Sequence, residues 1–234
     1  KKNLNRKKII YALLDISSDI PTGKIGLFNE TNKKLNTKNK VEILPSDTPK
    51  SVKAIKNKLD GKELTKKEID SIINDLISNN LLEVEIAYFV AACYNNNLTD
   101  KEVMYLTKAT IKEGNKLRLN KKIIADKHCI GGVPNNRTTM LIIPIVSTAG
   151  ITMPKTSSRS ITSPSGTADT MEVLSKVSFN ANQVKKIIKK TNACIVWNEG
   201  MEITGADSKL IKIRHPLRLD PQGLMIASIL AKKQ

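Results

Sequence analysis

The sequence predicts a multidomain α/β protein with a small β-rich N-terminal domain, a helical-bundle subdomain and the first part of a mixed α/β domain. Three observations predict this class. Residues 1–47 alternate short apolar runs with turns and show no helical period. Four segments within residues 48–115 show a helical apolar period with start and stop signals. After residue 116, short β-branched runs alternate with helical segments.

Each expected element has a local signal. Thr48 with Pro49 predicts the start of the first bundle helix, and Gly61 its end. Two further helices begin with capping boxes, Thr65 with Glu68 and Thr99 with Glu102. In the α/β part, residues 116–204, we expect strands at 123–125, 151–153 and 194–197 and helices at 138–148, from 167 and at 183–191. Residues 205–234 are expected to return to the bundle, with a final helix after Asp220 as N-cap and Pro221.

Composition narrows the functional classes. The 234 residues are 40% hydrophobic and carry a formal net charge of +17, which first suggests a nucleic-acid partner. The excess is mostly lysine spread over every segment, and only 3% of residues are aromatic, so we expect a solvated basic surface instead. Three widely spaced cysteines without a CxxC pair suggest neither a disulfide framework nor a zinc site, but a reduced, cytoplasmic protein. No apolar run reaches membrane length.

The stretch from residue 126 to 174 has the composition of an anion pocket. It combines the Lys127–His128 pair, the Gly131–Gly132 pair and a dense run of hydroxyl side chains. Backbone N–H groups freed by glycine, hydroxyl donors and fixed cations are the groups that bind phosphate. The stretch follows a predicted strand, where α/β sheets place their ligands.

Three motifs in this stretch, DKHCIGGV, PKTSSRSITS and GTADTMEVL, resemble the thymidine phosphorylase superfamily, and within it the archaeal-type AMP phosphorylases. The resemblance covers nearly the whole chain. It implies reversible phosphorolysis of AMP, and of other nucleoside 5′-monophosphates, to free base and ribose 1,5-bisphosphate. It further implies inorganic phosphate as co-substrate, no cofactor or metal, and a homo-oligomer that dimerises through the helical subdomain.

The resemblance also implies two sets of ligands. The attacking phosphate is assigned to Lys127, Cys129, Thr139, Ser157 and Thr167. The nucleotide is assigned to Gly132, Ser158, Arg159, Ser160, Ile161, Thr162, Ser163, Thr167 and Ser228. Cys129 stands where most relatives have serine, and a thiol is a poor hydrogen-bond donor, so we expect weaker phosphate binding.

Arg159 has one expected role, whereas Asp220, His128 and Lys232 each have two. The guanidinium of Arg159 can donate two hydrogen bonds at once, which suits a 5′-phosphate. Asp220 is an N-cap by its sequence context and the proton donor to the leaving base by resemblance. His128 serves equally as an acid or base or as a residue that orients its loop. Lys232 lies four residues after Ser228 and is either a charge at a helix end or a base contact. Asp169 and Glu172 are expected to structure the following helix.

Competing functions remain at this stage: a thymidine or other pyrimidine nucleoside phosphorylase, a non-catalytic nucleotide-binding fragment and a basic nucleic-acid binder. The start without methionine and the end within the helical ASILAKKQ segment lead us to expect a fragment or one part of a split enzyme, inactive alone.

Overall fold

The computed structural model describes residues 10, 12, 14–36, 40–45, 47–114, 117–128, 137–160, 164–198, 201 and 205–233. The chain divides into two compact units, Lys1–Thr48 and Pro49–Gln234.

The first unit contains one helix, α1 (Asn29–Leu35), and no strand among its described residues. This differs from the β-rich pattern expected for residues 1–47, part of which lies outside the described residues. Ile16 and Phe28, which belong to the apolar runs, are exposed. Strands need paired neighbours and a covered apolar face to be stable, and this stretch alone supplies neither.

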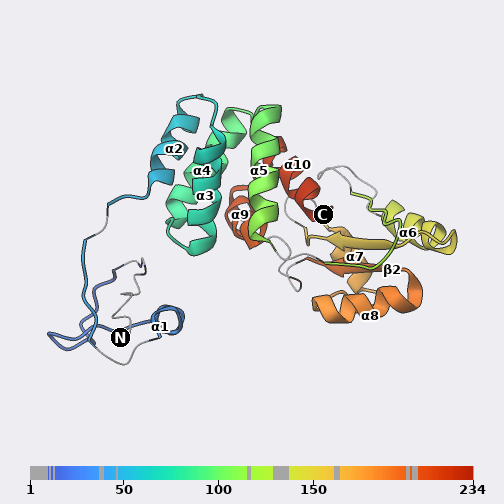
Figure 1. The fold of residues 1–234 in the computed structure, drawn as a ribbon, viewed down its shortest axis with the longest axis horizontal. Helices are drawn as coiled ribbons and strands as arrows, with labels where there is room; N and C mark the ends of the chain where they lie inside the picture. The colour runs from blue at the N-terminus through green and yellow to red at the C-terminus, as the bar shows by residue number, and fades with distance from the viewer. Residues whose placement is uncertain are drawn as a thin grey trace, which may run out of the picture. The chain divides into compact units, whose positions relative to one another are not determined.

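The second unit begins with a helical bundle, shown in Figure 1. Its helices are α2 (Lys50–Leu59), α3 (Lys66–Ser78), α4 (Glu83–Asn95) and α5 (Asp100–Glu113), joined by α9 (Gly205–Leu217) and α10 (Gln222–Lys232). All six helices contribute to one core that includes Ile72, Phe89, Leu106, Leu210 and Leu224. Residues 205–233 therefore return to the bundle after the α/β segment.

The N-caps of the helices agree with the sequence in two cases and differ in others. Thr65 accepts a hydrogen bond from the backbone N–H of Glu68, and Thr99 from that of Glu102, so both predicted capping boxes are confirmed. The expectation for Thr48 is wrong, because α2 begins at Lys50 and its N-cap is Pro49. Pro49 and Pro221 each lie one position before the first residue of their helix, and both have extended backbone angles.

Glu102 does more than cap α5. Its carboxylate accepts hydrogen bonds from Lys58 Nζ at 2.9 and 2.8 Å and from the backbone N–H groups of Leu64 and Thr99, both at 2.8 Å. The side chains of Lys58 and Glu102 are 3% and 0% exposed. A buried charge is tolerated only when it is paired and fully hydrogen-bonded, and this carboxylate meets that condition. It thereby joins α2, the α2–α3 connection and α5.

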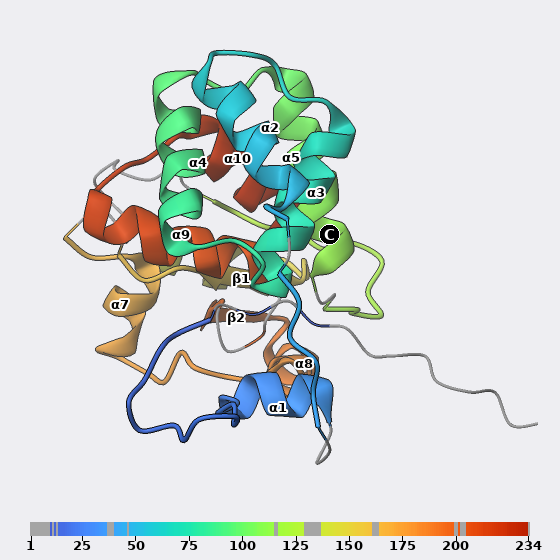
Figure 2. The same ribbon diagram turned by 90° about the vertical axis from the view of Figure 1, so that its left-hand side faces the viewer.

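The α/β segment contains a two-stranded parallel sheet of β1 (Met153–Ser157) and β2 (Ala193–Trp197), in register from Met153 opposite Ala193 to Ser157 opposite Trp197. Around it lie α6 (Thr138–Thr148), α7 (Thr167–Glu172) and α8 (Ala181–Thr191). Figure 2 shows α8 on one face of the sheet, where its buried residues meet Val196. The expected strand at 123–125 is reduced to a bridge between Ile124 and Thr152.

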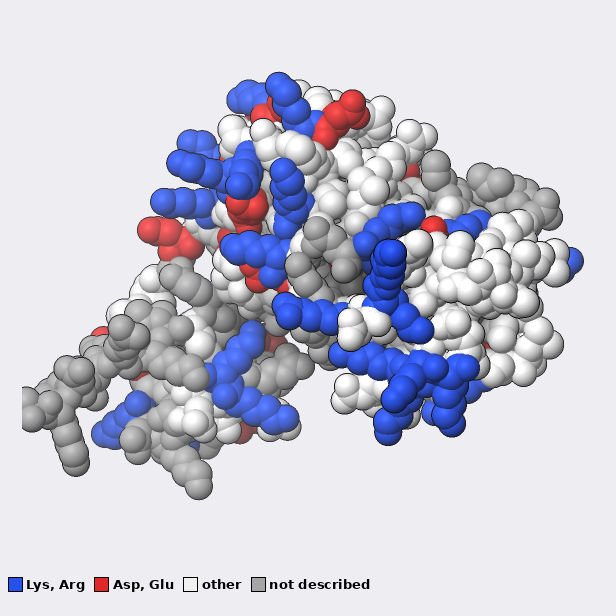
Figure 3. Space-filling view, turned by 45° about the vertical axis from the view of Figure 1, so that its right-hand side comes forward, with Lys and Arg blue, Asp and Glu red and all other residues white. Residues whose placement is uncertain are grey.

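The surface of the described residues carries its basic side chains in several groups. Figure 3 shows lysine and arginine in separate clusters with acidic and uncharged surface between them. Four exposed lysines lie on α8, opposite its buried Val184 and Ile188. None of the described helices combines the length and the apolar character needed to cross a membrane.

The Glu102 contact yields a prediction about stability. Replacing Glu102 by Gln leaves the Lys58 ammonium buried without its counter-charge, which typically costs about 3–5 kcal/mol. We expect the free energy of unfolding, measured by urea titration, to fall by about this amount. Asp60→Asn is the matched control, because Asp60 and its partner Lys62 are both 64% exposed. Equal stability of the two variants would contradict the role given to Glu102.

Candidate active site

The carboxyl ends of β1 and β2 place several predicted ligands in one region. Parallel strands bring these ends to the same edge of a sheet, which is where open α/β folds bind ligands. Ser157 is the last residue of β1, and Thr167 is the first residue of α7. Both side chains are buried. Each therefore has its hydroxyl near a strand or helix end, although Ser157 also donates to the carbonyl of Ser158 at 2.9 Å.

Lys127 and Thr139 come together as predicted phosphate ligands. Lys127 Nζ donates to Thr139 Oγ1 at 3.0 Å, across the twelve residues that separate them in the chain. Thr139 is 0% exposed and lies in the first turn of α6. The start of α6 also presents backbone N–H groups, so this corner combines a cation, a hydroxyl and a positive helix end. Cys129, Gly132, Ile161, Thr162 and Ser163 lie outside the described residues.

His128 forms a buried pair with Asp126, which the sequence did not single out. Nδ1 of His128 lies 2.5 Å from Oδ2 of Asp126. In the described part of the chain, Nε2 of His128 has no hydrogen-bond partner. Residues two apart on an extended segment face the same side, so the D-K-H order is a signal that could have identified the pair. The contact places the imidazole of His128 beside the carboxylate of Asp126.

Burial and neighbouring charges set the protonation of this pair. Burial lowers the pKa of His128 below its ordinary value of 6.5, and Lys155 adds to this, although Asp126 partly offsets the effect. Burial raises the pKa of the Asp126 carboxyl, but the contact with His128 and the charges of Lys155 and Lys233 outweigh it, so the net direction is downward. The arrangement at neutral pH is an ionised carboxylate beside a neutral imidazole.

Arg159 is held by carboxylates of its own chain. Its guanidinium donates to Glu172 at 2.5 and 2.8 Å and to Asp169 at 3.1 Å, and it lies 4.7 Å from the centre of the Trp197 ring. Asp169 also accepts from the backbone N–H groups of Ser160 and Gly166, at 2.7 and 2.9 Å. Asp169 and Glu172 thus structure the start of α7, and they fasten the loop after β1 to it.

Gly166 is required by the same loop. A Cβ at this position would lie 2.9 Å from backbone atoms of Ser158, Arg159 and Ser160, closer than real Cβ atoms approach. Only glycine lets the two ends of the loop meet at this distance. The SPSG run therefore has a structural reason for its glycine.

Asp220 occupies the connection between α9 and α10 and is not an N-cap. The prediction of a cap is wrong, because the N-cap of α10 is Pro221 and it makes no side-chain cap. Instead Arg214, which is 3% exposed, donates from Nη2 to Asp220 Oδ1 at 2.6 Å. Asp220 is half-buried. Its carboxylate is therefore positioned by α9 rather than by the start of α10.

Ser228 and Lys232 lie one turn apart on α10. Ser228 is buried. Lys232 Nζ lies 2.8 Å from Asp207 Oδ2 of α9, and both side chains are 6% exposed. Lys232 is the basic residue of the last turn of α10, as one of its two readings expected, and its ion pair with Asp207 is buried.

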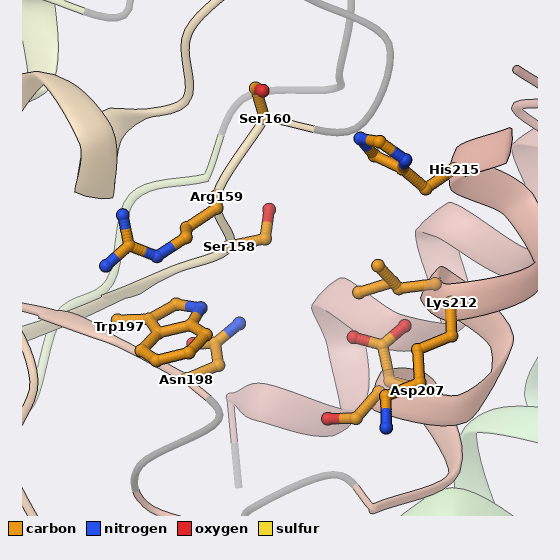
Figure 4. Close-up of a pocket in the computed structure, with 10 residues that line it drawn as sticks. Ser158, Arg159, Ser160, Trp197, Asn198, Asp207, Lys212 and His215 are labelled. Carbon is orange, nitrogen blue, oxygen red and sulfur yellow. The ribbon is translucent and has the colours of Figure 1, made fainter.

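A cleft of about 400 Å³ lies within the size range of small-molecule sites. Its lining includes Ser158, Arg159 and Ser160 of the predicted nucleotide ligands, but none of the described phosphate ligands and neither Asp220 nor Ser228. Figure 4 shows its two walls. One wall follows the carboxyl edge of the sheet and consists of Ser158, Arg159, Ser160, Trp197 and Asn198. The other is a face of α9 and consists of Asp207, Ser208, Ile211, Lys212 and His215. The sequence identified the three loop residues but missed the other lining residues. The only local signal for Trp197 and Asn198 was the end of a predicted strand, and the α9 wall was not predicted to line a site.

The two-part architecture defines a class of protein. The model of the glycosyl transferase family, helical bundle domain, matches residues 52–114, and that of the glycosyl transferase family, a/b domain, matches residues 121–218. Together they cover most of the second unit. The second unit is thus similar to this glycosyl transferase family over both of the family's domains. The crystal structure of anthranilate phosphoribosyltransferase from Thermus thermophilus shares the fold, with a TM-score of 0.63 at 18% identity over 76% of this chain and 55% of that chain.

Curated relatives are more specific. The chain is 49% identical to an AMP phosphorylase of Pyrococcus horikoshii over 97% of its length and 46% of the relative, and 45% identical to that of Methanococcoides burtonii over 96% and 45%. It is also 48% identical to a putative thymidine phosphorylase of Acidovorax sp., over 55% of this chain and 25% of the relative. The chain spans about half the length of the AMP phosphorylases it matches.

The Asp126–His128 pair predicts a pH response. The folded protein favours neutral His128, so it binds fewer protons than the unfolded chain once the pH falls below about 6.5, and stability declines from there toward acid. We expect the ring signals of His128 in an NMR titration to shift with a midpoint below 6.5. Since the chain has two histidines, a His215→Gln variant assigns the signals. Asp126→Asn should lower the midpoint further, and a midpoint at or above 6.5 would contradict the assignment.

Proposed function

We propose that the complete protein is a glycosyltransferase that catalyses reversible phosphorolysis of AMP, and of other nucleoside 5′-monophosphates, to free base and ribose 1,5-bisphosphate. The observation that carries this proposal is the 42–49% identity to five AMP phosphorylases over nearly the whole chain. The contact between Lys127 and Thr139 supports it independently, because it forms a cation–hydroxyl corner suited to phosphate.

The reaction needs positioning more than activation of the nucleophile. An oxygen of inorganic phosphate attacks C1′ of the ribose, the bond from C1′ to the base nitrogen breaks, and the departing base takes up a proton. Lys127, Thr139, Ser157 and Thr167 are the proposed ligands of the attacking phosphate, with Cys129 contributing its backbone N–H. Fixing the phosphate beside C1′ supplies much of the rate enhancement through orientation and electrostatic stabilisation.

Asp220 is the proposed proton donor to the leaving base. Its contact with Arg214 holds the carboxyl group at the junction of α9 and α10. Ser228 and Lys232, on the same helix pair, are proposed to contact the base or ribose. The loop residues from Ser158 to Ser163 with Gly132 and Thr167 are proposed to hold the nucleotide.

The proposal extends to assembly and location. Homodimerisation through the bundle is supported by α4, whose side chains Val84 and Tyr88 are exposed although the helix is apolar on most sides. We further propose that the enzyme works in the cytoplasm with phosphate as co-substrate and without a cofactor.

Incubation of the complete polypeptide with AMP and phosphate tests the proposal. Free adenine and ribose 1,5-bisphosphate are the expected products, in equal amounts and only when phosphate is present. No release of base from AMP, CMP, GMP or UMP would refute the proposal.

A pyrimidine nucleoside phosphorylase is the second candidate, favoured by the 48% identity to a putative thymidine phosphorylase over 128 residues. Thymidine and phosphate distinguish the two, because release of thymine without release of base from any nucleotide would support the second candidate.

Asp220 yields a prediction for catalysis. Loss of a general acid typically slows the chemical step by about 10²–10⁴-fold, so Asp220→Asn should lower kcat by this factor with AMP. The KM for phosphate should change little, because Asp220 is not among the proposed phosphate ligands. Asp100→Asn, an exposed change on α5, is the control. Wild-type kcat in Asp220→Asn would remove it from the mechanism.

A further inference from the structure

The cation on the sheet-side wall of the cleft already has carboxylate partners. Arg159 is the cation of that wall, and it is paired with both Glu172 and Asp169. Two carboxylates beside one guanidinium leave a net negative charge there at neutral pH. A dianionic phosphate at this point would face two like charges at close range, which disfavours its binding.

The opposite wall has a lysine and a histidine without such partners. Lys212 and His215 lie three residues apart on α9, which places them on one face of the helix. Both are exposed and line the cleft. Among the residues that the structure describes, neither side chain has an ion pair or a hydrogen bond, whereas Asp207 in the same wall is neutralised by Lys232.

The geometry suits a ligand that reaches from one wall to the other. In Figure 4 the imidazole of His215 extends from α9 toward the loop of Ser158 and Ser160. Lys212 has a flexible four-carbon stem that can bring its ammonium group to a ligand in the cleft. Serine hydroxyls on one side and a lysine with an imidazole on the other are donors that a phosphate monoester accepts.

We propose that Lys212 and His215 bind the 5′-phosphate of the nucleotide and so distinguish nucleotides from nucleosides, while Arg159 positions the loop of Ser158 and Ser160. The assignment rests on the proposed function and names the specificity residues of its substrate site. It changes the role expected for Arg159 from a phosphate clamp to a residue that acts through its loop.

Direct binding measurements on the complete polypeptide test this assignment without requiring turnover. Calorimetry would give the Kd of AMP, ribose 5-phosphate and adenosine for the wild type, for the double variant Lys212→Ala/His215→Ala and for Arg159→Ala. Lys190→Ala, an exposed change on α8, controls for the loss of general positive charge. Thermal unfolding of each variant confirms that it is folded.

Each hydrogen bond to a charged group contributes roughly tenfold or more in affinity, so the double variant should bind AMP about 100-fold more weakly. The affinity for ribose 5-phosphate should fall by a similar factor. The affinity for adenosine should not change, so the ratio of adenosine affinity to AMP affinity should rise by the same factor. Arg159→Ala should instead weaken AMP and adenosine alike, because the loop serves both.

Two outcomes would overturn the assignment: AMP affinity of the double variant equal to that of Lys190→Ala, or loss of AMP binding with retained adenosine binding in Arg159→Ala. Failure of the proposed function looks different. In that case the wild type releases no base from any nucleotide, yet AMP and ribose 5-phosphate binding still depends on Lys212 and His215.

Discussion

The buried carboxylate of Glu102 is the constraint on which the bundle depends. It accepts from one ammonium group and two backbone N–H groups that belong to three separate parts of the chain: α2, the α2–α3 connection and the start of α5. A hydrophobic contact tolerates small shifts of its partners, but a desolvated charge does not, because each missing donor leaves an unsatisfied oxygen. The bundle is therefore fixed in register at its interior. The helices that return to the bundle, α9 and α10, pack on the same core.

Asp169 plays a corresponding role at the sheet edge. It joins Arg159, the backbone of Ser160 and the start of α7, while the missing side chain of Gly166 allows the loop to close. The motif is thus built in two layers. Some of its polar residues, such as Ser158 and Ser160, line the cleft, and others hold those residues in place. The sequence separates the two tasks in part, since Asp169 and Glu172 are expected from it to structure the following helix.

This explains which features were predictable from the sequence. The capping boxes at Thr65 and Thr99, the helix Thr138–Thr148 and the strand ending at Trp197 depend on residues close together in the chain, so local patterns identify them. The family resemblance identified Lys127 and Thr139 as neighbours. Arg214 lies six residues before Asp220, so that contact is local in the chain. Lys232 meets Asp207 across the α9–α10 pair, and the α9 wall of the cleft arises only after the chain has returned to the bundle. Those contacts depend on tertiary packing. The errors at Thr48 and Asp220 have a common cause. In both places the proline that follows is itself the N-cap, so the helix begins one residue later than expected.

The anchorage of α9 has a consequence for how ligand affinity arises. Lys209 on this helix donates to the carbonyls of Leu76 and Ile77 at the end of α3, whereas Trp197 belongs to the sheet that α8 covers. The two walls of the cleft are thus attached to separate hydrophobic cores. A substrate that touches both walls couples these cores, and part of its binding free energy is used to select the conformers in which they stand at the right separation. Truncating the substrate at either end would then lower the population of competent conformers as well as remove contacts.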